Sequence, residues 1–550
     1  MEKIGQDLDT MKRVPLADNH VAMIRDIGTE RSYKAGEMVA NVGDPMDEFL
    51  YVLEGEIEIV DPYTGGRMVE STLGPTQFMG ELAFLNAGGF FLDMRAAKDT
   101  SVIAAPRVAM LDLMSKVPEL SDHIIGVFAA RRRRQFEDQR SSIKLIGADR
   151  DAAVQRVESF LRRNRIPMQS YDLDDQHDEA LQLCNLVEHK PAVIFDRDEV
   201  IEDPTPLKVA RRLGLDLTIC DQQTFDVLIV GGGPGGVAAA VYAGAEGLCA
   251  LVVEDTAIGG QAGMSSRIEN YMGFPTGISG ADLVYRGEIQ AMKFGTRFAM
   301  PRRVKSLTQR DDGMFCCALD GSEDGEESVI CARTVVVATG VKYRRLPIDN
   351  IRDYEGAGIY YAATDMEARF CRGSDAVVVG GGNSAGQAAM YLARNANHVH
   401  VVVRGDSLAS SMSEYLTKRL ENDPAVTIHY NTEVSCVHGE GRLQQVTLKT
   451  PDGEQLLDTR TCFVMIGAAP NTEWLCEGIE LDERGFVRTG EEVGGDSQYA
   501  TSIPGVFAVG DVRSGSVKRV ASAVGEGSVV ISSAWNHVAR QLEEEKKVSA

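Results

Sequence analysis

The sequence lacks any run of about 18 apolar residues, and polar residues follow Met1 directly. A membrane-spanning helix needs such a run and a signal peptide needs an apolar segment, so we expect neither and predict a cytoplasmic protein. Positive charge is scarce as well, since the formal net charge is −24. Nucleic-acid binding requires a clustered positive field, and we interpret the one basic block, residues 131–134, as the solvated end of a helix. No nucleic-acid partner is therefore expected.

A CxxC pair is also absent, although the chain has ten cysteines. Their spacing indicates neither a disulfide framework nor a zinc site, and no other metal site is expected. Most of the cysteines lie in apolar, strand-like runs, as Cys462 does, and are expected to be buried as small hydrophobic residues. Cys316 and Cys317 are adjacent, so a bridge between these two would be strained.

The N-terminal part of the chain consists of short alternating runs, such as 49–53 and 57–60, separated by glycines. This pattern predicts a small β-barrel or jelly roll. The segment also resembles the cyclic-nucleotide-binding domain family. The resemblance rests on residues 33–37, 42–44, 54–56 and 78–82.

In that family a glycine–glutamate pair holds the ribose of the nucleotide, and a later arginine holds the cyclic phosphate. Gly80 and Glu81 match the pair, but Phe91 stands in the arginine position, with Arg95 four residues later. Without a guanidinium, a buried phosphate has no bidentate charge-assisted partner. Two interpretations stay open: a site for a nucleotide-like ligand at Gly80 and Glu81, or a regulatory or oligomerising module. The helical stretch that follows leads into a strand at 143–147 and not into a helix-turn-helix, which excludes a transcription factor of this class.

Residues 141–221 are predicted to form a small α/β domain. Its order of elements resembles a thioredoxin or glutaredoxin fold, with Pro191 where that family carries a cis-proline. The family's thiols belong where the first strand meets the first helix, yet residues 147–150 contain no cysteine. Dithiol exchange is therefore excluded, and docking or packing is the expected role. The elements are strands at 143–146, 168–171 and 192–195, and helices at 152–163 and 206–213.

The pattern most informative about function begins with an apolar strand at 225–230, which is followed by a glycine-rich turn and a helix. Gly231 permits the tight turn, Gly233 lets backbone amides approach a pyrophosphate, and Gly236 lets the helix pack on the strand. The second strand of this unit ends in Glu254, placed to bind the adenosine ribose. These residues predict a dinucleotide site.

A second strand–turn–helix unit begins at 376–379, and its second strand ends in Arg404 instead of an acid. A cation at this position suits the 2′-phosphate of NADPH, so NADPH is favoured over NADH, although no second arginine follows Arg404. The turn residues of this predicted NADPH site are Gly380, Gly382, Asn383, Ser384 and Ala385.

Further segments occur in the order found in thioredoxin reductases: 259–261, 268–271, 337–340, 466–472, 509–512 and 518–521. The resemblance implies an FAD domain in two parts, 222–347 and 467–550, with an NAD(P)H domain, 348–466, inserted between them. It also implies a homodimer, and a rotation of the NAD(P)H domain between flavin reduction and reoxidation. The residues it places near FAD are Gly260, Gln261, Asn270, Gly340, Asp511, Arg519, Val520 and Ala521.

The predicted fold is therefore multi-domain. Residues 1–140 form a cyclic-nucleotide-binding-like β-barrel or jelly roll with a C-terminal helix. Residues 141–221 form the thioredoxin-like domain without CxxC, and two Rossmann-type α/β domains for FAD and NAD(P)H follow.

The thioredoxin reductase family carries Cys-Ala-Thr-Cys shortly before its second glycine turn. Here Ala362, Ala363, Thr364 and Asp365 occupy that stretch, so no catalytic residue is assigned. Asp365 cannot carry electrons, although a carboxylate near the flavin could donate or accept a proton. Cys371 lacks a partner in the sequence, and a structural position at the start of the next strand is expected for it.

Three hypotheses follow. The leading one is an FAD-dependent oxidoreductase that accepts hydride from NADPH without an internal CxxC relay. Its acceptor would be a protein disulfide, an iron–sulfur protein, a quinone or oxygen. The second is a genuine thioredoxin-disulfide reductase. The third is a redox sensor in which the flavin state or a bound nucleotide changes the interaction with a partner.

Overall fold

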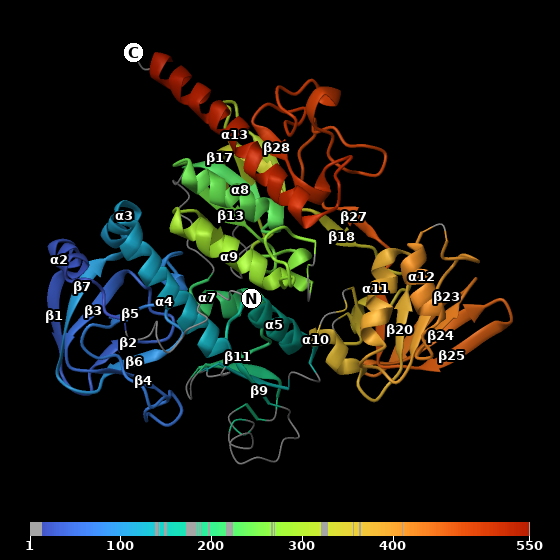
Figure 1. The fold of residues 1–550 in the computed structure, drawn as a ribbon, viewed down its shortest axis with the longest axis horizontal. Coiled ribbons are helices and arrows are strands. Elements are labelled where there is room, and N and C mark those ends of the chain that lie inside the picture. The colour runs from blue at the N-terminus through green and yellow to red at the C-terminus, as the bar shows by residue number, and fades with distance from the viewer. Residues whose placement is uncertain are drawn as a thin grey trace.

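The computed structural model describes residues 14–137, 141, 143–147, 151–171, 183, 185, 187–188, 190–195, 199–215, 224–265, 268, 270–320, 328–355, 357–361, 363, 365–409 and 411–548. The blue N-terminal elements and the orange elements around β20 lie on opposite sides of the molecule (Figure 1). The green elements and the red C-terminal helix lie between and above them.

The N-terminal elements form a barrel of two antiparallel sheets, with the strand orders β1-β7-β3-β5 and β2-β6-β4. Side chains from both sheets, among them Phe49, Ile57 and Val102, share one hydrophobic core. The predicted runs at 49–53 and 57–60 are therefore strands, and most of their side chains are buried in this core. The bounds are β1 Thr29–Tyr33, β2 Met38–Ala40, β3 Glu48–Glu54, β4 Ile57–Val60, β5 Phe78–Met79, η1 Leu82–Phe84, β6 Asp93–Ala96 and β7 Thr100–Pro106, with helices α2 Asp18–Ile27, α3 Arg107–Lys116 and α4 Pro118–Glu137.

A small α/β unit follows, with the strand order β11-β10-β8-β9. β8 and β9 are parallel, whereas β10 and β11 are antiparallel to their neighbours. The side chain of Asp151 caps α5 by accepting hydrogen bonds from the amides of Ala153 and Val154. Each predicted element of this unit is present, but Pro191 does not follow a cis peptide bond. The bounds are β8 Lys144–Ile146, α5 Ala152–Arg163, β9 Gln169–Tyr171, β10 Ala192–Ile194, β11 Val200–Glu202 and α7 Pro206–Arg212.

The central sheet has the order β14-β13-β12-β17-β16-β15, and β28 adds to β17 from far along the chain. Strands β14, β13, β12, β17 and β28 are parallel, which requires helical crossovers over the sheet faces. Helix α8 is buried between this sheet and the C-terminal helix α13 (Figure 1). The bounds are β12 Thr224–Val230, α8 Pro234–Ala245, β13 Ala250–Val253, η2 Ala262–Met264, α9 Gly280–Lys293, β14 Arg297–Ala299, β15 Val304–Gln309, β16 Phe315–Leu319, β17 Val329–Val337, β28 Val506–Ala508, η6 Gly510–Val512 and α13 Val520–Val548.

The outer sheet is parallel, with the order β19-β26-β20-β21-β22, and a three-stranded antiparallel sheet lies beside it. The chain passes from the central sheet through β18 and returns through β27, and these two strands pair with each other. The bounds are β18 Val341–Tyr343, η3 Ile351–Tyr354, β19 Ile359–Tyr360, α10 Asp365–Ala368, η4 Arg369–Cys371, β20 Ala376–Val379, α11 Asn383–Leu392, β21 Val399–Val402, α12 Glu414–Glu421, β22 Val426–His429, β23 Glu433–Gly439, β24 Leu443–Thr450, β25 Gly453–Asp458, β26 Thr461–Val464, β27 Ala468–Pro470 and η5 Gly490–Val493.

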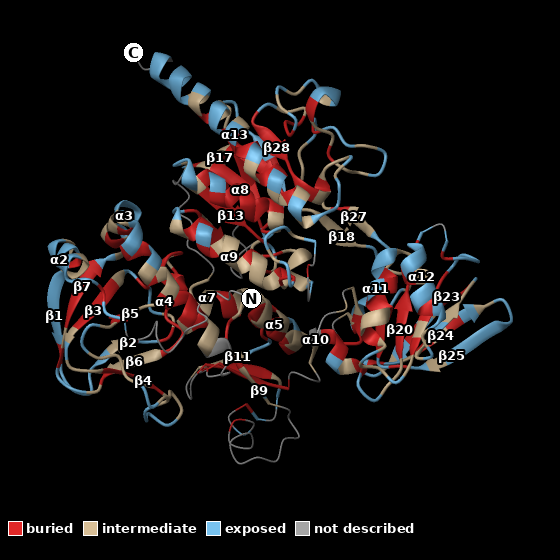
Figure 2. Cartoon of the chain, viewed as in Figure 1, coloured by how far each residue is buried: buried red, intermediate tan, exposed pale blue. Residues whose placement is uncertain are grey.

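Burial is concentrated on the strands of the central and outer sheets, on α8 and inside the barrel, as the red segments of Figure 2 show. Strands covered on both faces have continuous apolar sequences, and all four residues of β20 are buried. Among the described residues, no helix is both long and apolar enough to cross a membrane.

The cysteine analysis was wrong in one respect. Cys316 on β16 and Cys331 on β17 lie directly opposite each other and form a disulfide, with their Cα atoms 4.1 Å apart. Strand pairing brings them together, so their spacing in the sequence carried no signal. The other described cysteines are free: Cys317, Cys371 and Cys462 are buried, Cys476 is half-buried, and Cys249 and Cys436 are exposed.

Candidate functional site

The first glycine turn connects β12 to α8 at the carboxyl edge of the central sheet. A Cβ atom on Gly236 would lie 1.9 Å from the carbonyl oxygen of Gly231, and one on Gly231 would lie 2.4 Å from that of Ala338. Both positions therefore require glycine for packing. Gly233 differs, because a Cβ there would meet no atom within 4 Å. Gly233 is also the N-cap of α8 and no side chain caps the helix, so the first amides of α8 remain available to an anion.

Glu254 lies beside this turn and is 8% exposed. Its carboxylate accepts a hydrogen bond of 2.7 Å from the amide of Gly232 and one of 3.1 Å from that of Thr256. Burial raises the pKa of the Glu254 carboxyl to about 7. The sequence predicted a ribose-binding acid at this position; the structure adds that the same carboxylate braces the glycine turn.

A loop after β13 packs on the turn from the other side. The amide of Gly259 donates to the carbonyl of Gly232 over 2.7 Å, and a Cβ on Gly260 would lie 3.2 Å from the Cα of Gly233. Gln261 donates its side-chain amide to the carbonyl of Val341 at the start of β18. Gly260 and Gln261 are therefore next to the turn.

Two other residues predicted to approach the flavin, Gly340 and Asn270, have more open space around them than Gly260 and Gln261. Gly340, directly before β18, adopts a φ of +59°, and a Cβ atom there would meet no atom within 4 Å. The side chain of Asn270 is exposed.

The C-terminal part contributes the segment that begins at η6. Glu526 accepts a hydrogen bond of 2.6 Å from the amide of Gly510 and pairs with Arg513 at 3.0 Å, which positions this segment. Asp511 is half-buried, burial raises the pKa of its carboxyl, and no hydrogen bond to that carboxyl is found among the described residues. Such a carboxylate suits a ligand hydroxyl group. At the start of α13, Arg519 and Ala521 are exposed and Val520 is half-buried.

The second glycine turn connects β20 to α11 at the carboxyl edge of the outer sheet. Gly380 has a φ of +143°, and a Cβ there would lie 2.4 Å from the carbonyl oxygen of Met465. Gly382 is the N-cap of α11, again without a side-chain cap. Asn383 is held by the amide of Ser413, which donates to its Oδ1 over 2.7 Å.

Arg404 stands just beyond the end of β21, and its side chain is exposed. Ser384 is exposed as well, whereas Ala385 is buried where the helix packs on the turn. The predicted NADPH residues therefore lie at one edge of one sheet, at the ends of β20 and β21.

The stretch that carries thiols in thioredoxin reductases is only partly described, since Ala362 and Thr364 lie outside the described residues. Ala363 is half-buried, and Asp365 begins α10. Cys371 is fully buried, its Sγ lies 3.3 Å from the Thr461 hydroxyl oxygen, and burial raises its pKa. A thiolate is the reactive form of cysteine, so this environment favours a structural role.

Helix α5 of the small α/β unit contacts this region through an ion pair that sequence reasoning did not find. Arg369, directly after α10, lies 3.3 Å from the carboxylate of Glu158 on α5, and Glu158 also pairs with Arg162 at 2.8 Å. Glu158 is 7% exposed. The only sequence signal was an acidic residue on the amphipathic helix, which does not identify a partner.

The structure also corrects the interpretation of residues 131–134 as a solvated helix end. Arg132 is buried and donates from Nε to Glu81 over 2.7 Å, while its guanidinium lies 4.6 Å from the centroid of the Phe91 ring. Arg131 donates to the carbonyl of Gly80 over 3.0 Å. Glu81 also accepts a hydrogen bond from the amide of Ala83. Gly80 and Glu81, the predicted ligand residues of the barrel, therefore contact α4 of their own domain.

A family model described as pyridine nucleotide-disulphide oxidoreductase matches residues 225–527, more than half of the chain. The chain belongs to the pyridine nucleotide-disulphide oxidoreductase family. A second model, described as cyclic nucleotide-binding domain, matches residues 30–117. This member of the oxidoreductase family thus carries a cyclic-nucleotide-binding-type domain before its central and outer sheets.

Curated relatives agree with this assignment. A thioredoxin reductase of Treponema pallidum is 32% identical over 57% of this chain and 97% of its own length. The NADPH-dependent thioredoxin reductase 3 of Arabidopsis thaliana is 34% identical, over 57% of this chain but 58% of its own length. A 34.2 kDa protein in a rubredoxin operon of Clostridium pasteurianum is 31% identical over 56% of this chain and 96% of its own length.

Two solved structures are similar as well. The thioredoxin reductase of Lactococcus lactis in its FR conformation has a TM-score of 0.50 and 27% identity, covering 57% of this chain and 99% of that one. The thioredoxin reductase of T. acidophilum has a TM-score of 0.50 and 28% identity, covering 58% and 100%. The protein is thus a flavoprotein oxidoreductase of the thioredoxin-reductase-like kind, and its family implies FAD and NADPH as cofactors.

Proposed function

We propose that this chain is an FAD-dependent oxidoreductase that takes hydride from NADPH and passes electrons on without a dithiol relay of its own. The observation that carries the proposal is the pair of glycine turns at residues 231–236 and 380–385. Each lies at the carboxyl end of a strand whose sheet neighbours are parallel to it, and each opens a helix without a side-chain cap. Ligands of open α/β sheets bind at such strand ends.

The first turn is the proposed FAD site. Gly233 leaves room for a pyrophosphate at the amides of α8, and Glu254 lies where it can accept from the adenosine ribose. Asp511 offers a half-buried carboxylate without a hydrogen bond from the described residues, which suits the hydroxyl groups of the ribityl chain. The other proposed contacts are Gly231, Gly236, Gly260, Gln261, Asn270, Gly340, Arg519, Val520 and Ala521. We assign residues 222–347 and 467–550 to this domain.

The second turn is the proposed NADPH site, in a domain of residues 348–466. Gly382 and the open amides of α11 would hold the pyrophosphate, and the exposed Arg404 would pair with the 2′-phosphate. Gly380, Asn383, Ser384 and Ala385 shape the turn. The antiparallel pair β18 and β27 is the connection through which this domain would rotate against the flavin domain.

When both are bound, the nicotinamide supplies a hydride to the flavin, and the reduced flavin supplies electrons to an acceptor. The chain contributes alignment and electrostatics, because the groups placed around both turns are backbone amides and polar or charged side chains such as Glu254, Asn383 and Arg404. No side-chain nucleophile takes part. Cys371 is unsuited to a relay, since its thiol is fully buried and its pKa is raised.

The acceptor would therefore meet the flavin directly, and it would be a protein disulfide, an iron–sulfur protein, a quinone or oxygen. One relative is named for its place in a rubredoxin operon, which makes rubredoxin a specific candidate to test. Many relatives are named thioredoxin reductases, so a genuine thioredoxin-disulfide reductase is the second proposal. A redox sensor is the third, and slow turnover with every acceptor together with ligand-dependent assembly would favour it.

The experiment is an anaerobic titration of the flavin-loaded protein. Limiting NADPH is added, the visible flavin band is followed, and oxidised thioredoxin, rubredoxin, a quinone or oxygen is then supplied to separate samples. We expect NADPH to bleach the flavin, and expect thioredoxin to leave it bleached while another acceptor restores it. A flavin that NADPH cannot bleach would refute the hydride proposal. Rapid recovery with thioredoxin would refute the missing relay, and Cys371→Ser would then show whether that thiol carries it.

The small α/β unit at residues 141–221 contains no CxxC pair, and we propose docking as its role. Its α5 places Glu158 against Arg369, next to the stretch that carries thiols in thioredoxin reductases. We also propose a homodimer, because Tyr242, Val529 and Trp535 expose apolar surface on two helices that pack together. A monomeric mass by light scattering would refute the dimer.

A further inference from the structure

The barrel contacts the central sheet at its otherwise open edge. Strand β14 is the last strand in the order, so the backbone of Phe298 has a strand partner on one side only. Asn86 of the barrel completes the other side: it donates from Nδ2 to the carbonyl of Phe298 over 2.9 Å and accepts from the amide of Phe298 over 2.8 Å. Asn86 is 8% exposed. One side-chain amide therefore satisfies both edge groups, which are costly to bury unpaired.

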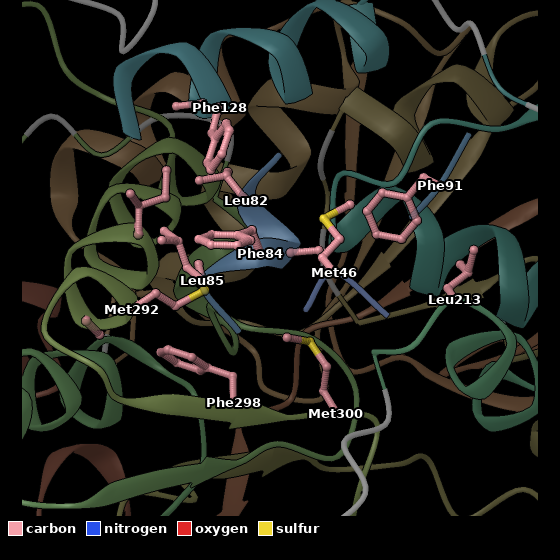
Figure 3. Close-up of a cluster of buried hydrophobic side chains, with 14 of the residues drawn as sticks. Met46, Leu82, Phe84, Leu85, Phe91, Phe128, Leu213, Met292, Phe298 and Met300 are labelled. Carbon is pink, nitrogen blue, oxygen red and sulfur yellow. The ribbon is translucent and has the colours of Figure 1, made fainter. Parts of the chain in front are cut away.

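Apolar side chains surround the two hydrogen bonds between Asn86 and Phe298. Figure 3 shows Leu82, Phe84 and Leu85 of the barrel beside Met292, Phe298 and Met300 of the flavin domain. Each of the six is at most 6% exposed, so the contact has the character of a domain core. The barrel residues belong to the segment that begins directly after Gly80 and Glu81.

A second contact runs from the barrel to α9. Arg132 of α4 pairs with Glu81 of the barrel, and Asp122 of the same helix pairs with Lys293 at the end of α9 over 2.6 Å. Arg165 of the small α/β unit pairs with Asp282 at the start of α9 over 2.6 Å. Helix α9 is thus held by charges from two preceding domains.

Helix α9 is in turn fixed to the loop after β13, which packs on the first glycine turn. The amide of Gly280 donates to the carbonyl of Ser265 over 2.8 Å, and a Cβ on Gly280 would lie 1.6 Å from the carbonyl oxygen of Ala262. The same loop carries Gly260, which packs on the first glycine turn. A continuous set of contacts therefore runs from Glu81 through α9 to the proposed FAD site.

We propose that the barrel is an internal docking module: its partner is the edge strand β14 and helix α9 of its own chain, and this docking replaces ligand binding at Glu81. Both motif positions that would contact a nucleotide, Glu81 and Phe91, support this role. Glu81 is buried and its carboxylate is taken by Arg132, and Phe91 lies under the same guanidinium. A nucleotide at Glu81 would have to break this ion pair and displace α4.

Hydrogen exchange of the full-length, flavin-loaded protein tests the docking. Asn86→Ala removes both contacts to Phe298, so exchange at β14 and along α9 should become about tenfold faster. The matched control is Asn41→Ala, because Asn41 bonds only locally to Asp44 on an exposed loop of the barrel. Equal exchange in the two variants would overturn the docking role.

Titration of the wild-type protein with cyclic AMP and cyclic GMP tests the second part and needs no variant. We expect no binding at nucleotide concentrations up to about 1 mM. A dissociation constant of that size corresponds to a binding free energy of roughly −4 kcal/mol. Micromolar binding that Glu81→Gln abolishes would overturn the replacement of ligand binding. Arg132→Met should loosen α9 as Asn86→Ala does, whereas Arg31→Met, which breaks the exposed pair with Glu48, should not. If NADPH failed to bleach the flavin, the proposed hydride transfer would be refuted. The hydrogen-exchange and nucleotide-titration results would still decide the docking proposal.

Discussion

Two glycines of the first turn, Gly233 and Gly236, are predicted to differ in their effects when each is replaced by alanine. Gly233 has a φ of −70° and open space at its Cβ position, so the fold tolerates a methyl group there. That open space is where a pyrophosphate has to approach the amides of α8. Gly233→Ala should therefore leave a folded protein that has lost its flavin.

The magnitude follows from the contacts involved. Hydrogen bonds to a charged group contribute about 1.5–3 kcal/mol each, and a methyl group that holds the phosphate away from two amides removes about 3–6 kcal/mol. Affinity for FAD should then fall by a factor of about 10² to 10⁴. Alanine is a less favourable N-cap than glycine, which destabilises the apoprotein, but it also reduces the freedom of the unfolded chain, which stabilises it. The free energy of unfolding of the apoprotein should therefore change by no more than about 1 kcal/mol.

Gly236→Ala is the contrasting variant. Its Cβ would lie 1.9 Å from the carbonyl oxygen of Gly231, so α8 has to move away from β12. Overpacking of this kind costs about 3 kcal/mol, and the apoprotein itself should melt earlier. The assay is the ratio of flavin to protein absorbance after desalting, together with thermal unfolding of the apoprotein. Full flavin retention by Gly233→Ala would refute the placement of the pyrophosphate at this turn.

Three further predictions concern single side chains. Arg404→Ala should raise the KM for NADPH about tenfold and leave that for NADH within about twofold; equal effects would sink the 2′-phosphate assignment. Glu254 has a folded-state pKa of about 7, above its ordinary 4.5, so it destabilises the apoprotein progressively as pH rises through that window. The melting temperature of Glu254→Gln should therefore rise relative to that of the wild type as the pH increases from 4.5 to 7. A constant difference between the two melting temperatures over this range would contradict this. Cys371→Ser should change flavin reduction and reoxidation rates less than about twofold, as stopped-flow absorbance can measure.

The two glycine turns could be predicted from sequence because the strand, turn and helix of each unit are consecutive in the chain, although the contacts of Gly231 with Ala338 and of Gly380 with Met465 are not local. The clash that makes Gly236 obligatory involves Gly231, five residues away, and both belong to one strand–turn–helix unit. The strands of the barrel and the elements of the small α/β unit were predictable for the same reason, since periodicity shows which face of an element is buried.

The features that connect domains were not predictable. Four consecutive arginines indicate a solvated helix end, and only the docking of α4 on the barrel buries Arg132 against Glu81. Cys316 and Cys331 become neighbours through the register of β16 and β17, and Asn86 finds the edge of β14 across more than two hundred residues.

Sequence by itself thus determined the family, the two parallel-sheet units and their glycine turns. Tertiary structure decided what the charged and polar residues of the barrel do. The physical reason is that a local pattern records which face an element buries, whereas the partner of a buried charge or amide depends on the domain packed against it.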